Sequence, residues 1–138
     1  MSGARVLLPQ GWPRPKGYAN GIAAEGRLVF VAGQIGWDER EQLVGGDFAD
    51  QFRQVLLNIL TVLAEAGAGP QHICRMTGFI TNREEYLAAL PVIGQHWKEL
   101  MGRAFPTMAV MVVAGLIEAG AKVEIETTAV IPLEDEAA

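Results

Sequence analysis

The sequence predicts an α/β (α+β) fold in which one mixed β-sheet carries two helices on one face. Two observations lead to this prediction. Two segments place apolar residues at helical spacing, and the segments around them are short runs rich in β-forming residues. In chain order the elements are ββαβαββ, and both helices are amphipathic, which favours a layered packing. The 138 residues, 50% of them hydrophobic, fit one domain with one core.

Residues 1–16 are expected to form an extended N-terminal segment ahead of the domain. The stretch 11–16 contains two prolines and two cations, which suit a chain running along a surface. Residues 18–24 and 27–35 are predicted to be two strands. Their closeness in the sequence indicates that they form a hairpin.

The first helix is predicted to begin after Asp47, whose carboxylate can accept a hydrogen bond from the N–H groups at a helix N-terminus. A pair of glycines breaks the chain just before it. Apolar residues then recur at helical spacing as far as Gly67, namely Phe48, Phe52, Val55, Ile59 and Val62.

The second helix is predicted to follow a short strand over residues 73–81. Asn82, with Glu85 three residues later, has the spacing of a capping box. Pro91 lies inside this helix and is expected to kink it, because its ring removes one backbone hydrogen bond. Gly102 is placed to end the helix. The apolar stripe consists of Leu87, Leu90, Trp97 and Leu100.

The last two strands are predicted over residues 107–114 and 122–131. Every residue from 108 to 114 is apolar, so both faces of that strand favour burial. The two helices can cover only one face of the sheet. We therefore expect another subunit to cover the second face, in an oligomer with closed cyclic symmetry.

Glu124 and Glu126 are candidate functional residues because of their place in the last strand. The two-residue period of a strand places both on the face away from the helices. A carboxylate on a covered face must be paired or hydrogen-bonded, so a ligand site is expected there. Alternatively, one or both carboxylates lie at a solvated rim or bind structural backbone N–H groups.

Charge and residue types argue against several function classes. The net charge of −5 has the wrong sign for neutralising phosphates, so no nucleic-acid partner is expected. No membrane span and no signal peptide are expected either, which predicts a cytoplasmic location. Cys74 is the single cysteine, which indicates neither a disulfide nor a metal cluster. His72 and His96 lack partners at metal-ligand or triad spacing and are expected at the surface, so no metal or cofactor is predicted.

Short motifs along most of the chain resemble one known family. They are Gly17-Tyr18, residues 31–36, Gly45-Gly46-Asp47, Gln51, Asn58, residues 64–68, Phe105-Pro106 and residues 123–126. In order and spacing this series is similar to the reactive intermediate deaminase (RidA/YjgF, endoribonuclease L-PSP-like) family. The resemblance implies a chorismate-mutase-like subunit and a homotrimer whose sheets line a central barrel. It also implies clefts between subunits, where 2-imino or 2-enamino acids are hydrolysed to 2-keto acids and ammonia.

The resemblance implies roles for individual residues. Glu124 matches the family's glutamate that holds or activates the attacking water. Tyr18 matches the cleft tyrosine, and Gly33 matches the glycine of the second strand. Backbone N–H groups near Gly33 and Thr107 are expected to help orient the ligand.

Three positions depart from the family pattern. Met108 stands where the family has its substrate-anchoring arginine, Ala32 where a hydroxyl residue is usual, and Leu90 where an asparagine is usual. A guanidinium binds a carboxylate through two charge-assisted hydrogen bonds, whereas a thioether makes an apolar wall. The ligand is therefore expected to be larger, less charged or anchored elsewhere. Arg14 or Lys16 could supply the anchor, or both could be ordinary surface cations.

The predicted domain spans residues 17–132 and is followed by an acidic flexible tail over residues 133–138. Its predicted site has Glu124 as the catalytic residue. The predicted substrate-binding residues are Tyr18, Ala32, Gly33, Thr107, Met108 and Arg14.

Two functions stay open at this point. The favoured one is a deaminase with an altered substrate, because imine hydrolysis is intrinsically easy and a general base contributing about 10²–10⁴-fold suffices. The other is a non-catalytic homotrimer that binds a small molecule between subunits, which the loss of the arginine supports. A ribonuclease is disfavoured, because the sequence has no basic stripe.

Overall fold

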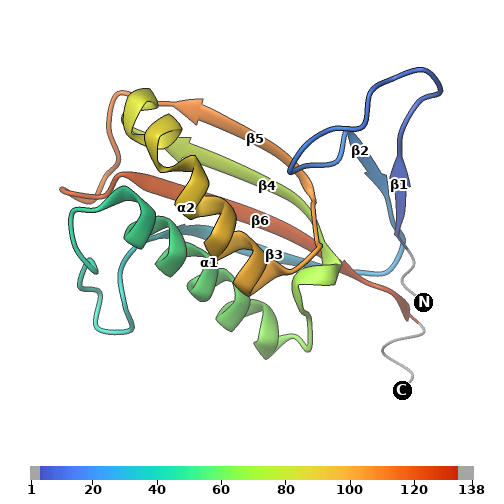
Figure 1. The fold of residues 1–138 in the computed structure, drawn as a ribbon. Helices are drawn as coiled ribbons and strands as arrows, with labels where there is room; N and C mark the ends of the chain where they lie inside the picture. Colours follow the sequence, from blue (N-terminus) through green and yellow to red (C-terminus); the bar gives the residue numbers. More distant parts are fainter. Residues whose placement is uncertain (1–3, 134–138) are drawn as a thin grey trace.

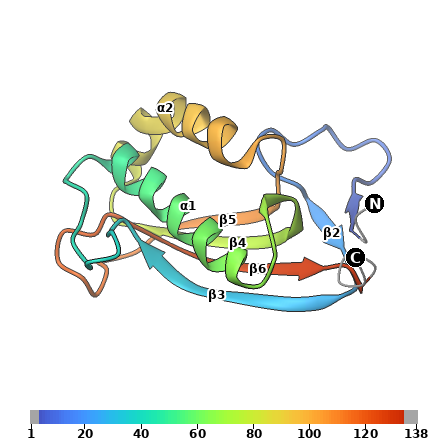
Figure 2. The same cartoon turned by 90° about the horizontal axis from the view of Figure 1, so that it is seen from below.

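The structure, a computed structural model, describes residues 4–133 and has two layers (Figures 1 and 2). One layer is a four-stranded mixed sheet, and the other consists of two helices on one face of that sheet. The predicted α+β class is confirmed. The elements are β1 (Arg5–Leu7), β2 (Gly21–Ala23), β3 (Arg27–Ile35), α1 (Phe48–Glu65), a 3₁₀ turn (Pro70–His72), β4 (Ile73–Ile80), α2 (Arg83–Met101), β5 (Thr107–Val112) and β6 (Val123–Ile131).

The four-stranded sheet has the order β3-β6-β4-β5. β3 and β4 are both antiparallel to β6, and the edge strand β5 is parallel to β4. The pairing of β3 with β6 shifts register between Val31 and Gln34. Ala32 and Gly33 therefore form a bulge, a feature that often lies next to functional sites.

The predicted hairpin of residues 18–24 with residues 27–35 is wrong. β2 pairs instead with β1, in a separate two-stranded sheet that includes part of the segment expected to be merely extended. β2 has three residues, whereas β6 offers β3 a partner along most of its length. The chain turns at Gly26 (φ 148°), where a Cβ would collide with the backbone of Ile131 at the end of β6. This close approach sets β3 beside β6.

Both helices begin at the predicted caps. Asp47 Oδ1 accepts a hydrogen bond from the Ala49 N–H at 3.1 Å, and Asn82 Oδ1 accepts one from the Glu85 N–H at 2.9 Å. α2 continues through Pro91 and ends at the predicted glycine. The kink expected at the proline stays a prediction.

The hydrophobic core lies between the helices and the sheet. The predicted alternation along β6 is confirmed, because Val123, Ile125, Ala129 and Ile131 are all buried beneath the helices. The acidic residues expected beyond this domain, 134–138, lie outside the described residues.

Three apolar residues assigned to the buried helix stripes are instead about 40% exposed, namely Val62, Leu87 and Leu90. In α1 the buried stripe passes through Leu56 and Leu63, which fill the core in place of Val62. Leu90 lines a cavity beside α2 that is described below.

The face of the sheet away from the helices exposes large apolar side chains. Leu28 and Phe30 of β3 are 57% and 72% exposed, and Met111 of β5 is 42% exposed. Glu124 and Glu126 of β6 lie on the same face. Large apolar side chains gathered on one face are typical of an interaction surface. The second subunit expected over this face stays a prediction.

A buried glutamine joins three parts of the chain. Gln51 in α1 is fully buried, and its Nε2 donates to the carbonyls of Gly45 at 2.7 Å and Gly120 at 3.0 Å. Its Oε1 accepts a hydrogen bond from the Lys122 N–H at 2.8 Å. Gln51 therefore holds the loop before α1 against the loop before β6, two residues from Glu124.

Replacing Gln51 with alanine is expected to lower the free energy of unfolding by about 3 kcal/mol or more, because three partly buried backbone groups lose their partner and removal of the fully buried side chain leaves a cavity. The midpoint of urea unfolding measures this change. Gln54→Ala is the control, because Gln54 is only half-buried and donates to Asn58 at 2.8 Å. We expect that control to cost less than about 1 kcal/mol. Equal effects of the two substitutions would contradict the joining role of Gln51.

Candidate functional site

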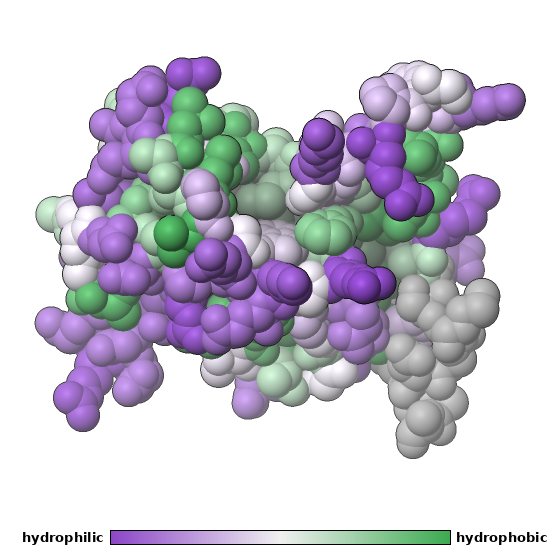
Figure 3. All heavy atoms as spheres, viewed as in Figure 1, coloured by the Kyte–Doolittle hydropathy of each residue, from purple (hydrophilic) through white to green (hydrophobic). Residues whose placement is uncertain are grey.

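A cavity of about 760 Å³ opens between α2, β5 and residues 16–18. Figure 3 shows this hollow near the centre of the view, with apolar residues in its floor and hydrophilic residues around it. Phe52, Trp97 and Met108 are among the apolar residues that line it. Its cations are Lys16, Lys98 and Arg103.

Three residues singled out from the sequence meet in this cavity. Tyr18 precedes β2, Leu90 lies in α2 and Met108 lies in β5, and all three line the same space. Two of the three positions interpreted as departures from the family pattern, 90 and 108, therefore both contribute apolar side chains to the same cavity.

The two cations considered as candidate anchors for a ligand differ in position. Both side chains are exposed, but Lys16 lines the cavity and Arg14 is not among the lining residues. Thr107 does not line the cavity either, and its hydroxyl donates to the carbonyl of Cys74 at 2.7 Å. The geometry therefore favours Lys16 over Arg14 as the cation nearest to a ligand.

Glu124 lies on the other side of the sheet from Met108. Met108 pairs with a core residue of β4, whereas Glu124 pairs with Phe79, which lies on the opposite face. A Cβ at Gly33 would collide with the Glu124 carboxylate, so this carboxylate lies directly on the backbone of the β3 bulge. Within one chain, Tyr18 and Met108 therefore do not share a pocket with Glu124.

The open face of the sheet presents a partly exposed carboxylate. The Glu124 carboxylate makes no hydrogen bond or ion pair within residues 4–133, so no N–H group there holds it. Ala32, in the adjacent bulge, is exposed as well. A second hollow of about 560 Å³ on this face is lined by Arg75, Glu126 and Thr128, among others. A ligand or water molecule approaching this face can reach both glutamates.

Tyr86 was missed by the sequence reasoning. It lines the cavity one helical turn before Leu90, and that spacing was the available signal. Its ring meets Phe48 edge-on, with 5.9 Å between ring centroids, and its hydroxyl has no hydrogen-bond partner within residues 4–133. Burial raises the pKa of the Tyr86 hydroxyl, which keeps this group a hydrogen-bond donor at neutral pH.

An aromatic pair forms the other end of the cavity. The rings of Trp97 and Phe105 are stacked, with centroids 6.5 Å apart and planes 4° from parallel. The Trp97 indole N–H donates to the carbonyl of Ala104 at 3.0 Å, which fixes this ring. Phe105 remains 44% exposed, so part of its ring is open to a ligand.

The histidine and cysteine next to β4 have structural environments. The prediction that His72 lies at the surface is wrong, since it is buried and its Nδ1 accepts a hydrogen bond from the Gly69 N–H at 3.0 Å. Burial raises the pKa of the Cys74 thiol, so the thiol stays neutral. Within residues 4–133, no three acidic, histidine or cysteine side chains cluster as metal ligands. No helix in that range has the length and apolar content needed to cross a membrane.

Fold and cavity together define the class of protein. A mixed sheet backed by two helices, with an apolar cavity at its edge strand and an unpaired carboxylate on its open face, is a two-layer α+β domain with a candidate small-molecule site. The Endoribonuclease L-PSP family model matches residues 13–131. The chain belongs to this family, the RidA/YjgF family.

Individual relatives agree with this assignment. A 2-iminobutanoate/2-iminopropanoate deaminase of Dermatophagoides farinae is 30% identical over 95% of the chain and 99% of the relative. A RutC family protein of Synechocystis is 35% identical over 87% of the chain and 91% of the relative. A Rid family protein of Yersinia pestis, described as of unknown function, superposes with a TM-score of 0.82 at 30% identity, covering 94% of this chain and 99% of that one.

Proposed function

We propose that this chain is a RidA-type deaminase that hydrolyses an imine or enamine in clefts between the subunits of a homotrimer. The observation that carries the proposal is the division of the site. Tyr18, Leu90 and Met108 line a cavity on one side of the sheet, and Glu124 lies unpaired on the other. A relative with deaminase activity in its name aligns along almost the entire chain, which supports this reaction class.

A homotrimer accounts for both features of the open face. Phe30 and Met111 need cover, and Glu124 needs a ligand pocket that its own chain does not provide. In a closed cyclic assembly, the sheet face of one subunit meets the edge of the next. Glu124 of one subunit then faces the cavity of its neighbour.

The single cysteine in the sequence supports a reducing, cytoplasmic setting.

The chemistry required is the addition of one water molecule across a C=N bond. Glu124 accepts a proton from water as the water oxygen bonds to the imine carbon, and the C=N π electrons move to the nitrogen. The nitrogen of the resulting carbinolamine is protonated and leaves as ammonia, while the C=O bond of the keto product forms. An iminium ion and water thus give a carbonyl compound and ammonium, without a cofactor.

The proposed substrate differs from the small 2-imino acids. Met108 offers no bidentate clamp for a carboxylate, and Leu90 beside it in the cavity and Ala32 in the hollow on the open face bring no polar side chain to the predicted cleft. 2-Iminopropanoate is therefore expected to be a poor substrate.

Two measurements test the proposal. Light scattering should give about three times the 14.9 kDa of one chain. A coupled assay, in which an amino-acid oxidase generates the imine in the reaction mixture, should show turnover of at least one imino acid. A monomer at micromolar concentration would overturn the shared cleft. A trimer that binds 2-keto acids without hydrolysing any imine would be the non-catalytic binding protein, the alternative that Met108 and Leu90 support.

A further inference from the structure

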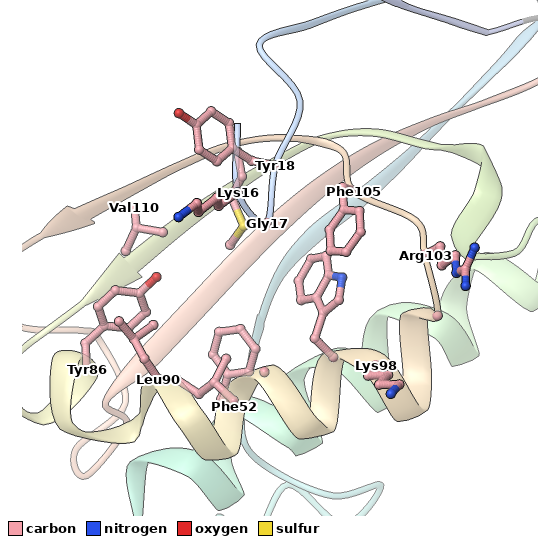
Figure 4. Close-up of a pocket in the computed structure, with 15 residues that line it drawn as sticks. Lys16, Gly17, Tyr18, Phe52, Tyr86, Leu90, Lys98, Arg103, Phe105 and Val110 are labelled. Carbon is pink, nitrogen blue, oxygen red and sulfur yellow. The ribbon is translucent and has the colours of Figure 1, made fainter. Parts of the chain in front are cut away.

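We propose that the substrate is a 2-imino acid with an aromatic side chain, its carboxylate held by Lys16 and Tyr86 and its ring packed against Phe105. This inference rests on the proposed deaminase function and adds the substrate class. It follows from the distribution of polar and apolar groups in the cavity (Figure 4).

The polar end of the cavity carries hydrogen-bond donors. In Figure 4 the Lys16 ammonium and the Tyr86 hydroxyl lie on the side of the cavity near Val110, with the Tyr18 hydroxyl beyond them. In the described range 4–133, Lys16 has no acidic partner and the Tyr86 hydroxyl has no hydrogen-bond partner. An ammonium group and a neutral hydroxyl both donate, and together they fit a carboxylate.

The other two cations of the cavity lie away from this end. Lys98 and Arg103 are near Phe105 in Figure 4, and their charged groups point outward from the lined space. Lys16 is therefore the cation placed to take over the role of the anchoring arginine. The lysine ammonium is a compact point charge that binds a carboxylate without fixing the plane of the carboxylate. Contacts to the side chain of the substrate must therefore supply more of the orientation of the substrate.

The apolar end of the cavity is suited to a ring. Phe105 is stacked on Trp97 through one ring face and is 44% exposed. A substrate ring packed against the open part of Phe105 extends this aromatic pair, in the offset or edge-on geometry that aromatic rings prefer. Because the Trp97 indole is fixed by its hydrogen bond to Ala104, this ring loses little conformational freedom when a substrate binds.

A glycine leaves room for that ring. Gly94 of α2 lines the cavity, and a Cβ added there would meet no atom within 4 Å. Glycine inside a helix is destabilising, so Gly94 lowers the stability of α2. In exchange, no side chain from this position projects into the cavity. The methyl group of a small 2-imino acid leaves most of this apolar space to water, whereas a phenyl ring occupies it.

The test compares two imines produced by one enzyme. D-amino-acid oxidase converts D-phenylalanine and D-alanine to their 2-imino acids, and semicarbazide traps the imine that the full-length protein has not hydrolysed. We expect kcat/KM to be about 10-fold or more higher for the aromatic imine, since even one methylene in an apolar pocket can change it by about 10-fold. Calorimetric titration with the stable products, 3-phenyl-2-oxopropanoate and 2-oxopropanoate, measures binding independently of turnover.

Variants assign the two ends of the cavity. Lys16→Ala should weaken binding of 3-phenyl-2-oxopropanoate by about 10-fold or more, and Lys16→Arg should restore it. Arg14→Ala is the matched control, because it removes an equal charge two residues from Lys16 but outside the cavity. It should change the affinity for 3-phenyl-2-oxopropanoate by less than about twofold. Gly94→Leu fills the apolar end and should bring the aromatic-to-methyl ratio of kcat/KM close to one. This variant favours the helix, so a loss of folding is not expected.

Failure of the inference and failure of the proposed function give different results. Hydrolysis of both imines with equal kcat/KM would overturn the aromatic substrate class and leave the deaminase function standing. Tight binding of the aromatic keto acid without imine hydrolysis would overturn the deaminase function and support the ligand class. An unchanged affinity in Lys16→Ala, or an equal loss in Arg14→Ala, would overturn the anchoring role of Lys16.

Discussion

Replacing Glu124 with glutamine is expected to lower kcat by about 100-fold or more, the scale of losing a general base. The amide keeps the size and the hydrogen-bonding oxygen of the side chain but cannot accept the proton of water. Because the Glu124 carboxylate makes no hydrogen bond or ion pair within residues 4–133, the substitution removes no such interaction there, and the amide keeps the packing against the β3 bulge. The trimer mass and the affinity for a 2-keto acid should therefore change little. Steady-state kinetics and light scattering on the same preparation measure both.

Two further variants separate a general base from a structural carboxylate. Glu126→Gln changes the same residue type on the same face two residues along β6, and its effect on kcat is expected to stay within about threefold. Gly33→Ala places a methyl group where the Glu124 carboxylate lies, so this flexible side chain must move. Activity should fall with little loss of stability. A fully active Glu124→Gln would move the chemistry elsewhere, and a variant that fails to assemble would make Glu124 structural.

Local periodicity was sufficient to predict the orientation of Glu124. The alternation along residues 123–131 depends only on the two-residue period of a strand, so it assigned the buried and open faces correctly. The helix caps at Asp47 and Asn82 were equally local, since each acts within three residues.

Pairing between distant segments could not be read from the sequence. The hairpin prediction failed because β3 takes its partner from β6, almost 100 residues later, rather than from the short strand before it. The separation of Met108 from Glu124 depends on the same kind of information. It follows from the register of β4 with β5 and with β6, which places the two side chains on opposite faces.

The position of Lys16 depended on backbone geometry as well. The sequence left Lys16 and Arg14 open as anchors, because an extended segment rich in proline gives no rule for which side chain turns inward. Gly17 has a φ of 81°, a conformation that side-chain-bearing residues rarely adopt, and the chain bends over residues 16–18. Lys16 and Gly17 of this bend both line the cavity.

Replacing Met108 with arginine is expected to raise kcat/KM for 2-iminopropanoate by about 10- to 100-fold. Met108 lines the cavity beside Tyr18 and is half-buried, so a guanidinium can reach the ligand and remain partly solvated. Two parallel hydrogen bonds to a carboxylate supply the binding that methionine lacks. Removing one partner of such a pair costs about 2–5 kcal/mol, and an introduced pair recovers part of this.

The effect of Met108→Arg on the aromatic imine should have the opposite sign. The guanidinium shortens the apolar cavity and adds a second anchor beside Lys16, which draws the carboxylate away from the position that places the ring on Phe105. Met108→Leu is the matched control, because it keeps an apolar side chain of similar volume and should leave the ratio of the two kcat/KM values nearly unchanged. If Met108→Arg folds and assembles but hydrolyses 2-iminopropanoate no faster, the carboxylate is bound too far from residue 108 for this side chain to set substrate choice.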